Sequence, residues 1–131
     1  LHLCLIASGI KTGDEVIIPD FTMISTAFAV CYTGAKPVFI DADPHTWDID
    51  VNKIEEKISS NTKAIIPVHI FGNMCNMDKI IDIAKKYNLT IIEDAAEAHG
   101  AGGLRSRPGP LVPHAAQCRR RRRSAGRRAR R

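Results

Sequence analysis

The sequence lacks three features that would define broad classes of protein. No apolar run approaches the roughly 18 residues of a membrane-spanning helix, and no signal-peptide pattern is present. The four cysteines, Cys4, Cys31, Cys75 and Cys118, form no CxxC pair and no metal-ligand spacing. We therefore expect no membrane anchor, no bound metal, reduced and mostly buried thiols, and a cytoplasmic location.

Charge of each sign is missing from one part of the chain. No acidic residue follows Glu97, and no arginine precedes Arg105. Residues 1–103 carry a net charge of −6, whereas residues 104–131 carry 11 arginines and no acid. The overall net charge of +5 is the sum of an acidic part and a strongly basic part, so it is no evidence that the folded part binds nucleic acid.

Residues 102–131 have neither helical nor strand periodicity, and five arginines follow one another from Arg119 to Arg123. Such a segment cannot bury enough apolar surface to offset the entropy of ordering it. We expect residues 1–101 to form one domain and residues 102–131 to be a disordered tail. Two origins remain open for the tail: a basic segment that binds RNA or another polyanion, or a reading-frame or assembly artefact.

Short apolar strands alternate with helical patterns along residues 1–101. Near-continuous apolar strands in strict alternation with helices predict an α/β fold, with a mostly parallel sheet and helices on both faces. The predicted strands are 15–19, 37–41, 63–68 and 89–92, and the predicted helices are 1–8, 22–31, 51–59 and 77–87. Thr22, Asp50 and Asn76 are the expected helix caps.

Polar side chains follow the predicted strands. Asp20, Asp41, His69 and Asp94 each stand at or just after the end of one strand. Because the carboxyl ends of parallel strands meet at one edge of a sheet, we expect these residues to gather there and to mark the functional site.

Asp94 is the residue on which the functional prediction depends. Small residues, including Ala95 and Ala96, follow it and leave room for a flat ligand against the backbone. A carboxylate in this position could bind a metal, cap the next helix, or face a ring nitrogen and keep it protonated, as pyridoxal phosphate enzymes require. The spacing alone leaves these three roles open.

Four segments in this order resemble the DegT/DnrJ/EryC1/StrS family of pyridoxal-phosphate sugar aminotransferases. They are GDEVIIP at 13–19, GAKPVFID at 34–41, TKAIIPVH at 62–69 and EDAAEAHGA at 93–101. The form with Glu97 is most similar to the perosamine-synthase branch. The resemblance covers residues 1–101 and implies a partial large domain of the type I pyridoxal-phosphate-dependent aminotransferase fold, which acts as a homodimer.

The resemblance also implies a reaction and roles for individual residues. Family members use pyridoxal 5'-phosphate to move an amino group from glutamate to a keto-sugar nucleotide. Asp94 would pair with the pyridine nitrogen, Met23 would take the ring-stacking position that is usually aromatic, and Glu97 would lie near the ring hydroxyl. His69 would line the substrate pocket, or would be a hydrogen-bonded structural histidine.

Two elements of the family pattern are missing. No lysine follows Lys86, so the Schiff-base lysine of the family has no counterpart, and the phosphate-binding Ser-Gly-Thr turn is also absent. We expect a chain that is incomplete at both ends and inactive as written. Two rivals remain: a small α/β module with a polyanion-binding tail, and a sugar dehydratase that uses a histidine in place of the lysine, although His114 lies in no matching context.

Overall fold

A computed structural model describes residues 1–99, so the predictions for the tail lie outside the described residues. Four strands form one sheet in the order β2-β1-β3-β4, and all three strand pairs are parallel. The predicted parallel sheet is therefore confirmed. The strands are β1 (Glu15–Pro19), β2 (Lys36–Ile40), β3 (Thr62–Ile65) and β4 (Thr90–Ile91).

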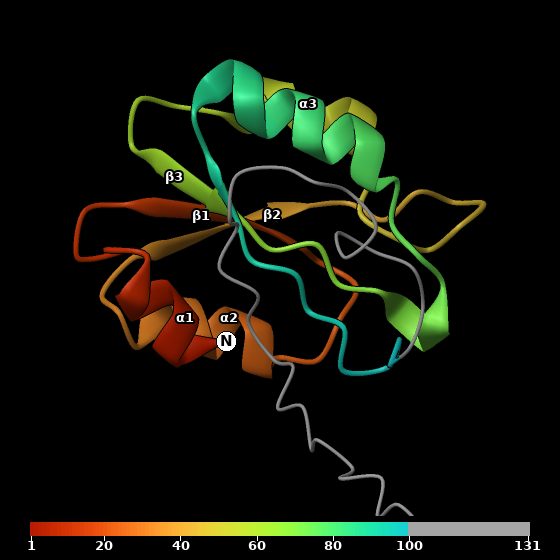
Figure 1. The fold of residues 1–131 in the computed structure, drawn as a ribbon, viewed down its shortest axis with the longest axis horizontal. Helices are drawn as coiled ribbons and strands as arrows, with labels where there is room; N and C mark the ends of the chain where they lie inside the picture. Colours follow the sequence, from red (N-terminus) through yellow and green to blue (C-terminus); the bar gives the residue numbers. More distant parts are fainter. Residues whose placement is uncertain (100–131) are drawn as a thin grey trace, which may run out of the picture.

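Helices cover both faces of this sheet, as predicted. Helices α1 (His2–Ala7) and α2 (Ser25–Cys31) lie on one face, and α3 (Met77–Tyr87) lies on the other (Figure 1). The predicted cap of α3 is confirmed, because the Asn76 side chain accepts a hydrogen bond from the Lys79 backbone N–H at 3.2 Å.

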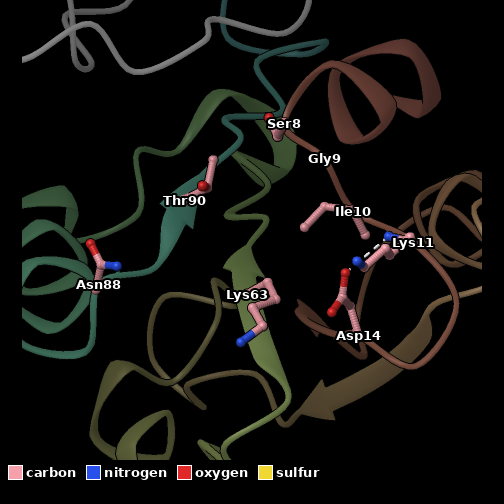
Figure 2. A pocket seen from close by; sticks show the side chains of 8 residues that line it. All are labelled: Ser8, Gly9, Ile10, Lys11, Asp14, Lys63, Asn88 and Thr90. Atoms are coloured by element: carbon pink, nitrogen blue, oxygen red, sulfur yellow. Dashed lines mark hydrogen bonds between the residues drawn. The ribbon is translucent and has the colours of Figure 1, made fainter.

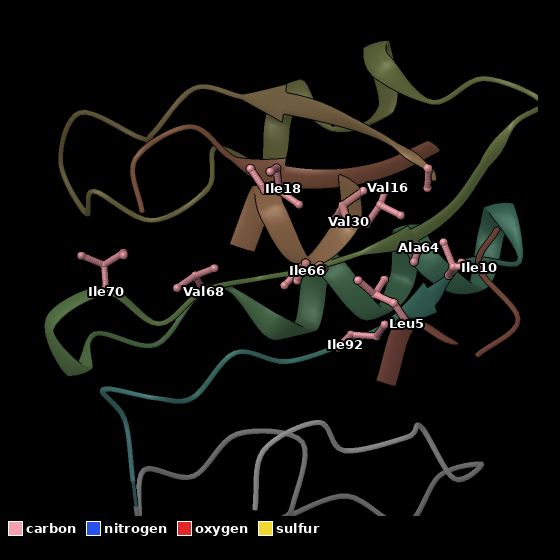
Figure 3. Close-up of a cluster of buried hydrophobic side chains, with 13 residues drawn as sticks. Leu5, Ile10, Val16, Ile18, Val30, Ala64, Ile66, Val68, Ile70 and Ile92 are labelled. Carbon is pink, nitrogen blue, oxygen red and sulfur yellow. The ribbon is translucent and has the colours of Figure 1, made fainter. Parts of the chain in front are cut away.

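The strands divide the apolar core into two layers. Ile17 packs in the layer beneath α3, whereas its neighbours Val16 and Ile18 pack in the layer beneath α1 and α2. Ile65 and Ile66 divide in the same way, because successive strand side chains point to opposite faces. Figure 3 shows the α1/α2 layer, which also contains Leu5, Ile10, Val30, Ala64, Val68, Ile70 and Ile92.

The predicted helix over 51–59 is wrong in type. Two short 3₁₀ helices occupy this stretch, η1 (Val51–Lys53) and η2 (Glu55–Lys57). Ile54 between them is fully buried, but Val51 and Ile58 are only partly buried, so no continuous apolar stripe holds a longer helix against the sheet. The cap is as predicted, since Asp50 accepts a hydrogen bond from the Asn52 backbone N–H at 3.0 Å.

The start of α2 also differs from the prediction, and α1 is buried on one face only. Helix α2 begins at Ser25, and the residue at its start, Ile24, makes no side-chain cap, so the predicted cap at Thr22 is wrong. In α1 only Leu5 is buried, while Leu3 and Ile6 are 79% and 53% exposed. Within the described residues α1 packs on one side alone, which leaves its outer apolar face uncovered.

The described cysteines are unpaired, but their exposure varies. Cys75 is buried and Cys4 is half-buried, whereas Cys31 is exposed, contrary to the prediction of mostly buried thiols. Burial, reinforced by the charge of nearby Asp48, raises the pKa of the Cys75 thiol to about 12.

The exposed Cys31 and the buried Cys75 should differ in their reactivity toward alkylating reagents. Because the thiolate is the reacting species, iodoacetamide at pH 8 should alkylate Cys31 at least about tenfold faster than Cys75 in the folded chain. Peptide mass spectrometry over a time course measures both rates. In urea the two rates should converge, and equal rates without urea would contradict the buried position of Cys75.

Candidate functional site

The pairing of β3 with β4 continues past both strands to the carboxyl edge of the sheet. The Asp94 backbone N–H donates to the Pro67 carbonyl at 2.9 Å, and the His69 N–H donates to the Asp94 carbonyl at 3.1 Å. Val68 and Asp94 form a parallel bridge. Two of the residues predicted to gather at this edge, His69 and Asp94, are therefore adjacent.

The Asp94 side chain is half-buried, and its Oδ1 accepts a hydrogen bond from the Ala96 backbone N–H at 3.2 Å. This bond closes a local turn, and no helix begins between Asp94 and His99. A carboxylate can accept about four hydrogen bonds, so the turn uses only part of the capacity of Asp94. Within residues 1–99 no cluster of ligands could hold a metal.

Strand alternation assigns Asp94 to one face of the sheet. Val68 and Ile92 both belong to the α1/α2 layer, and Asp94 is the bridge partner of Val68 and lies two residues after Ile92. Asp94 therefore points to the α1/α2 side. Met23, which is 70% exposed, lies two residues before α2 on this same side.

Glu97 has a partner within the chain. Its Oε2 accepts a hydrogen bond from the Phe71 backbone N–H at 2.6 Å. Phe71 has a φ of 52°, in the left-handed region that non-glycine residues rarely adopt. Glu97 thus stabilises the turn after β3 in this structure.

His69 is 1% exposed, and both of its ring nitrogens have partners within the chain. Nε2 lies 2.8 Å from Oε1 of Glu93, and Nδ1 accepts a hydrogen bond from the Cys75 backbone N–H at 3.3 Å. Of the two roles left open for His69, the buried ring supports the structural one.

Three exposed aromatic residues from separate loops meet at the same edge. The ring of Phe21, which follows β1, lies 5.4 Å from that of Trp47 and 6.5 Å from that of Phe71, measured between centroids. Trp47, like Phe71, has a positive φ. The sequence does not predict this cluster, because nothing in the spacing of the three residues links them. Strained backbone of this kind is common around functional sites.

The predicted edge residue Asp41 takes part in another interaction. Its Oδ2 lies 2.6 Å from Nζ of Lys53 in an exposed ion pair, and the hydrogen bond to Lys53 lowers the pKa of Asp41. The same bond raises the pKa of Lys53. Asp41 is thus already neutralised by a neighbour.

Two cavities of the described residues lie away from Asp94. One of about 240 Å³ lies at the opposite, amino edge of the sheet, between the end of α1 and the starts of β3 and β4 (Figure 2). Of its two lysines, Lys63 donates to the Ser60 carbonyl, and the backbone N–H of Lys11 donates to Asp14. The other, of about 390 Å³, lies beside the start of α3 and includes Asp48 and Lys79.

Comparison with known proteins gives a family match. The sequence model of the DegT/DnrJ/EryC1/StrS aminotransferase family matches residues 1–109. The chain belongs to this family. The resemblance read from the four segments is thereby confirmed, and so is the α/β fold, as part of a pyridoxal-phosphate-dependent aminotransferase domain.

Among curated relatives, GDP-perosamine synthase of Caulobacter vibrioides is 54% identical over 101 residues, which cover 77% of this chain and 27% of that protein. A dTDP-3-amino-3,6-dideoxy-alpha-D-galactopyranose transaminase of Aneurinibacillus thermoaerophilus is 52% identical over the same share of this chain and 28% of its own. The chain thus spans about a quarter of the length of these relatives.

Solved structures agree with this assignment. NtdA of Bacillus subtilis, with bound cofactor PMP, superposes with a TM-score of 0.77 at 41% identity, over 80% of this chain and 24% of its own. DesV of S. venezuelae, in complex with a ketimine intermediate, superposes with a TM-score of 0.75 at 40% identity, over 76% of this chain and 27% of its own.

None of the helices within residues 1–99 has the length and hydrophobicity needed to cross a bilayer.

Proposed function

We propose that this chain supplies the cofactor-aspartate part of an aminotransferase that moves an amino group from glutamate to a keto-sugar nucleotide, as in perosamine-type amino sugar biosynthesis. The observation that carries the proposal is the position of Asp94. Its main chain is bonded to Pro67 and His69, which follow β3, and its carboxylate lies half-buried at the carboxyl edge of a parallel sheet. The 54% identity to a GDP-perosamine synthase supports the substrate class.

Asp94 fits the pyridine nitrogen of pyridoxal 5'-phosphate. When bound, this cofactor delocalises the negative charge that develops on the substrate carbon into its ring. A carboxylate with unused acceptor capacity can hold a proton on the ring nitrogen and so favour that delocalisation. Ala95 and Ala96 add no bulk that would keep a flat ring away from Asp94.

The other assigned residues have narrower roles in the proposal. Met23, on the α1/α2 side and well exposed, would pack its thioether on the ring, a softer contact than an aromatic stack. Glu97 would approach the ring hydroxyl while keeping its bond to Phe71 through one oxygen. His69 would act beneath the pocket surface, because its ring is buried.

Residues 1–101 are proposed as the domain unit, and a homodimer as the working assembly. Exposed apolar side chains support the dimer. Phe21, Trp47 and Phe71 cluster at the site edge, and Leu3 and Tyr32 are exposed on α1 and just after α2. Clustered exposed apolar side chains are typical of an interaction surface.

The chain by itself should form no Schiff base with the cofactor. Lys36 and Lys63 lie at the amino ends of β2 and β3, opposite Asp94, and Lys53 is paired with Asp41, which raises its pKa and keeps the amine protonated. Borohydride reduction after addition of pyridoxal 5'-phosphate should therefore trap no stoichiometric adduct. Peptide mapping measures this, and one specifically modified lysine would contradict the proposed inactivity.

The function itself is tested by a chimera in which residues 1–101 replace the matching segment of the Caulobacter GDP-perosamine synthase. The remainder of that enzyme supplies what this chain lacks, so the chimera should transaminate the substrate of the parent with glutamate as donor. The parent enzyme is the control. A chimera that folds and binds the cofactor but does not transaminate would refute the proposal.

The alternative of a polyanion-binding module depends on residues 104–131, which lie outside the described residues. No observation in residues 1–99 favours it, and the relatives described above give it no support.

A further inference from the structure

We infer that Glu93 and His69 form a positioning pair that fixes Asp94 for its role at the cofactor. The inference rests on the proposed function, because that proposal gives Asp94 its role. Glu93 and His69 would touch neither the cofactor nor the substrate. They act through Asp94, so both are positioning residues.

The donor and acceptor nitrogens of His69 follow from its two hydrogen bonds. Nδ1 accepts from the Cys75 N–H, so Nε2 is the nitrogen that can donate. Nε2 then donates to Oε1 of Glu93 across 2.8 Å. The His69 side chain is 0% exposed and that of Glu93 only 11% exposed, so water competes little for this charge-assisted bond.

The side-chain pair and the main-chain bonds hold neighbouring parts of the backbone at residues 93 and 94. Glu93 immediately precedes Asp94, and His69 donates its own backbone N–H to the Asp94 carbonyl. The Asp94 N–H is bonded to Pro67, so the segment that follows β3 holds the Asp94 backbone at both the N–H and the carbonyl. The bond between the side chains of His69 and Glu93 adds a third link one residue upstream.

Alternation places the two carboxylates on opposite faces. Glu93 meets His69 on the α3 side, where Cys75 also packs, whereas Asp94 points to the α1/α2 side. The pair therefore lies directly behind Asp94 and cannot obstruct a ligand in front of it. Loss of the pair should allow the residue 93–94 peptide to rotate and misplace the Asp94 carboxylate.

Amide hydrogen exchange of the full 131-residue chain, measured by NMR without cofactor, tests this inference. Replacing Glu93→Ala should speed exchange at the His69 and Asp94 amides by about tenfold, because a charged hydrogen bond is lost. Glu93→Gln keeps an acceptor and should speed it by only about threefold. The Ile66 amide, bonded to Ile17 in the centre of the sheet, should be unchanged in both.

Glu56→Ala is the matched control, since Glu56 is exposed on η2. Equal acceleration at Ile66 would indicate general destabilisation and overturn the inference, as would wild-type exchange at Asp94 in both Glu93 variants. If Glu93→Ala does not fold, the milder Glu93→Gln decides by the same comparison of Asp94 with Ile66.

In the chimera, Glu93→Ala should lower turnover by about tenfold while the KM for glutamate stays unchanged, and Glu93→Gln should restore most of the rate. If the chimera without a Glu93 substitution is inactive, but the Glu93 variants show faster amide exchange at Asp94, only the proposed function is refuted. An active chimera whose Glu93 variants show no local acceleration and full turnover would refute the positioning pair alone.

Discussion

Replacing Asp94→Ala in the chimera should lower transaminase turnover by about 100- to 1,000-fold, the usual loss when one preorganised electrostatic group is removed from a reacting centre. Without the carboxylate, the ring nitrogen loses the partner that keeps its proton, so the cofactor accepts charge less well. Steady-state rates with glutamate and the keto-sugar nucleotide measure the loss. The substrates' own contacts are not changed, so the loss should appear in kcat.

Two further substitutions at Asp94 separate charge from shape. Asp94→Asn keeps the size of the side chain and can still accept the bond from Ala96, but it has no negative charge, so it should be nearly as impaired as Asp94→Ala. Asp94→Glu keeps the charge one methylene out of place and should retain more activity.

Asp82→Asn is the control, because Asp82 is an exposed residue of α3 on the opposite side of the sheet. It should leave turnover unchanged. If the Asp94→Ala variant is as active as the unsubstituted chimera, Asp94 only closes the turn to Ala96. The proposed function would then lose the observation that carries it.

Some elements could be read from the sequence because their signals are local. The bounds of β1 were predicted correctly, since an uninterrupted apolar run ends at Pro19, which cannot continue a central strand. Helix α3 was likewise predicted from Met77 to Tyr87, where a capping asparagine precedes an apolar stripe at helical spacing.

Other elements depend on packing that the sequence does not display. The stretch 51–57 has the spacing of an amphipathic helix, but only Ile54 is fully buried, and two 3₁₀ turns form instead. Helix α2 begins three residues after the predicted cap at Thr22, and the residue before it, Ile24, provides no side-chain cap.

The same division applies to the candidate site. The adjacency of His69 and Asp94 followed from strand direction alone, because parallel strands bring their carboxyl ends together. The bond from the Phe71 N–H to Glu97 joins segments that have no periodicity, and it forms with the turn 69–72 in a conformation that has a rare positive φ at Phe71. Strand alternation places Glu93 and His69 on one face, but the sequence does not show that the two side chains bond to each other.

The second large effect is expected in the core. Ile65→Ala and Ile66→Ala should each lower the free energy of unfolding by about 2–5 kcal/mol, since both side chains are fully buried and truncation leaves a cavity. Urea unfolding of the 131-residue chain, followed by circular dichroism, measures the shift of the midpoint. Ile6→Ala is the matched control, because Ile6 is 53% exposed on α1, and its effect should stay within about 0.5 kcal/mol.

The two core variants together test the two-layer architecture. Ile65 packs beneath α3, and Ile66 packs beneath α1 and α2. A large loss of stability in both variants therefore requires that helices cover both faces of the sheet. A large loss for Ile65→Ala with little for Ile66→Ala would mean that the α1/α2 layer is not packed in solution. Asp94 points to this same layer, and Met23 leads into α2, so the cofactor face would then be without support. The contribution of Ile66 to the free energy of unfolding and the function of Asp94 therefore depend on the same layer of the fold.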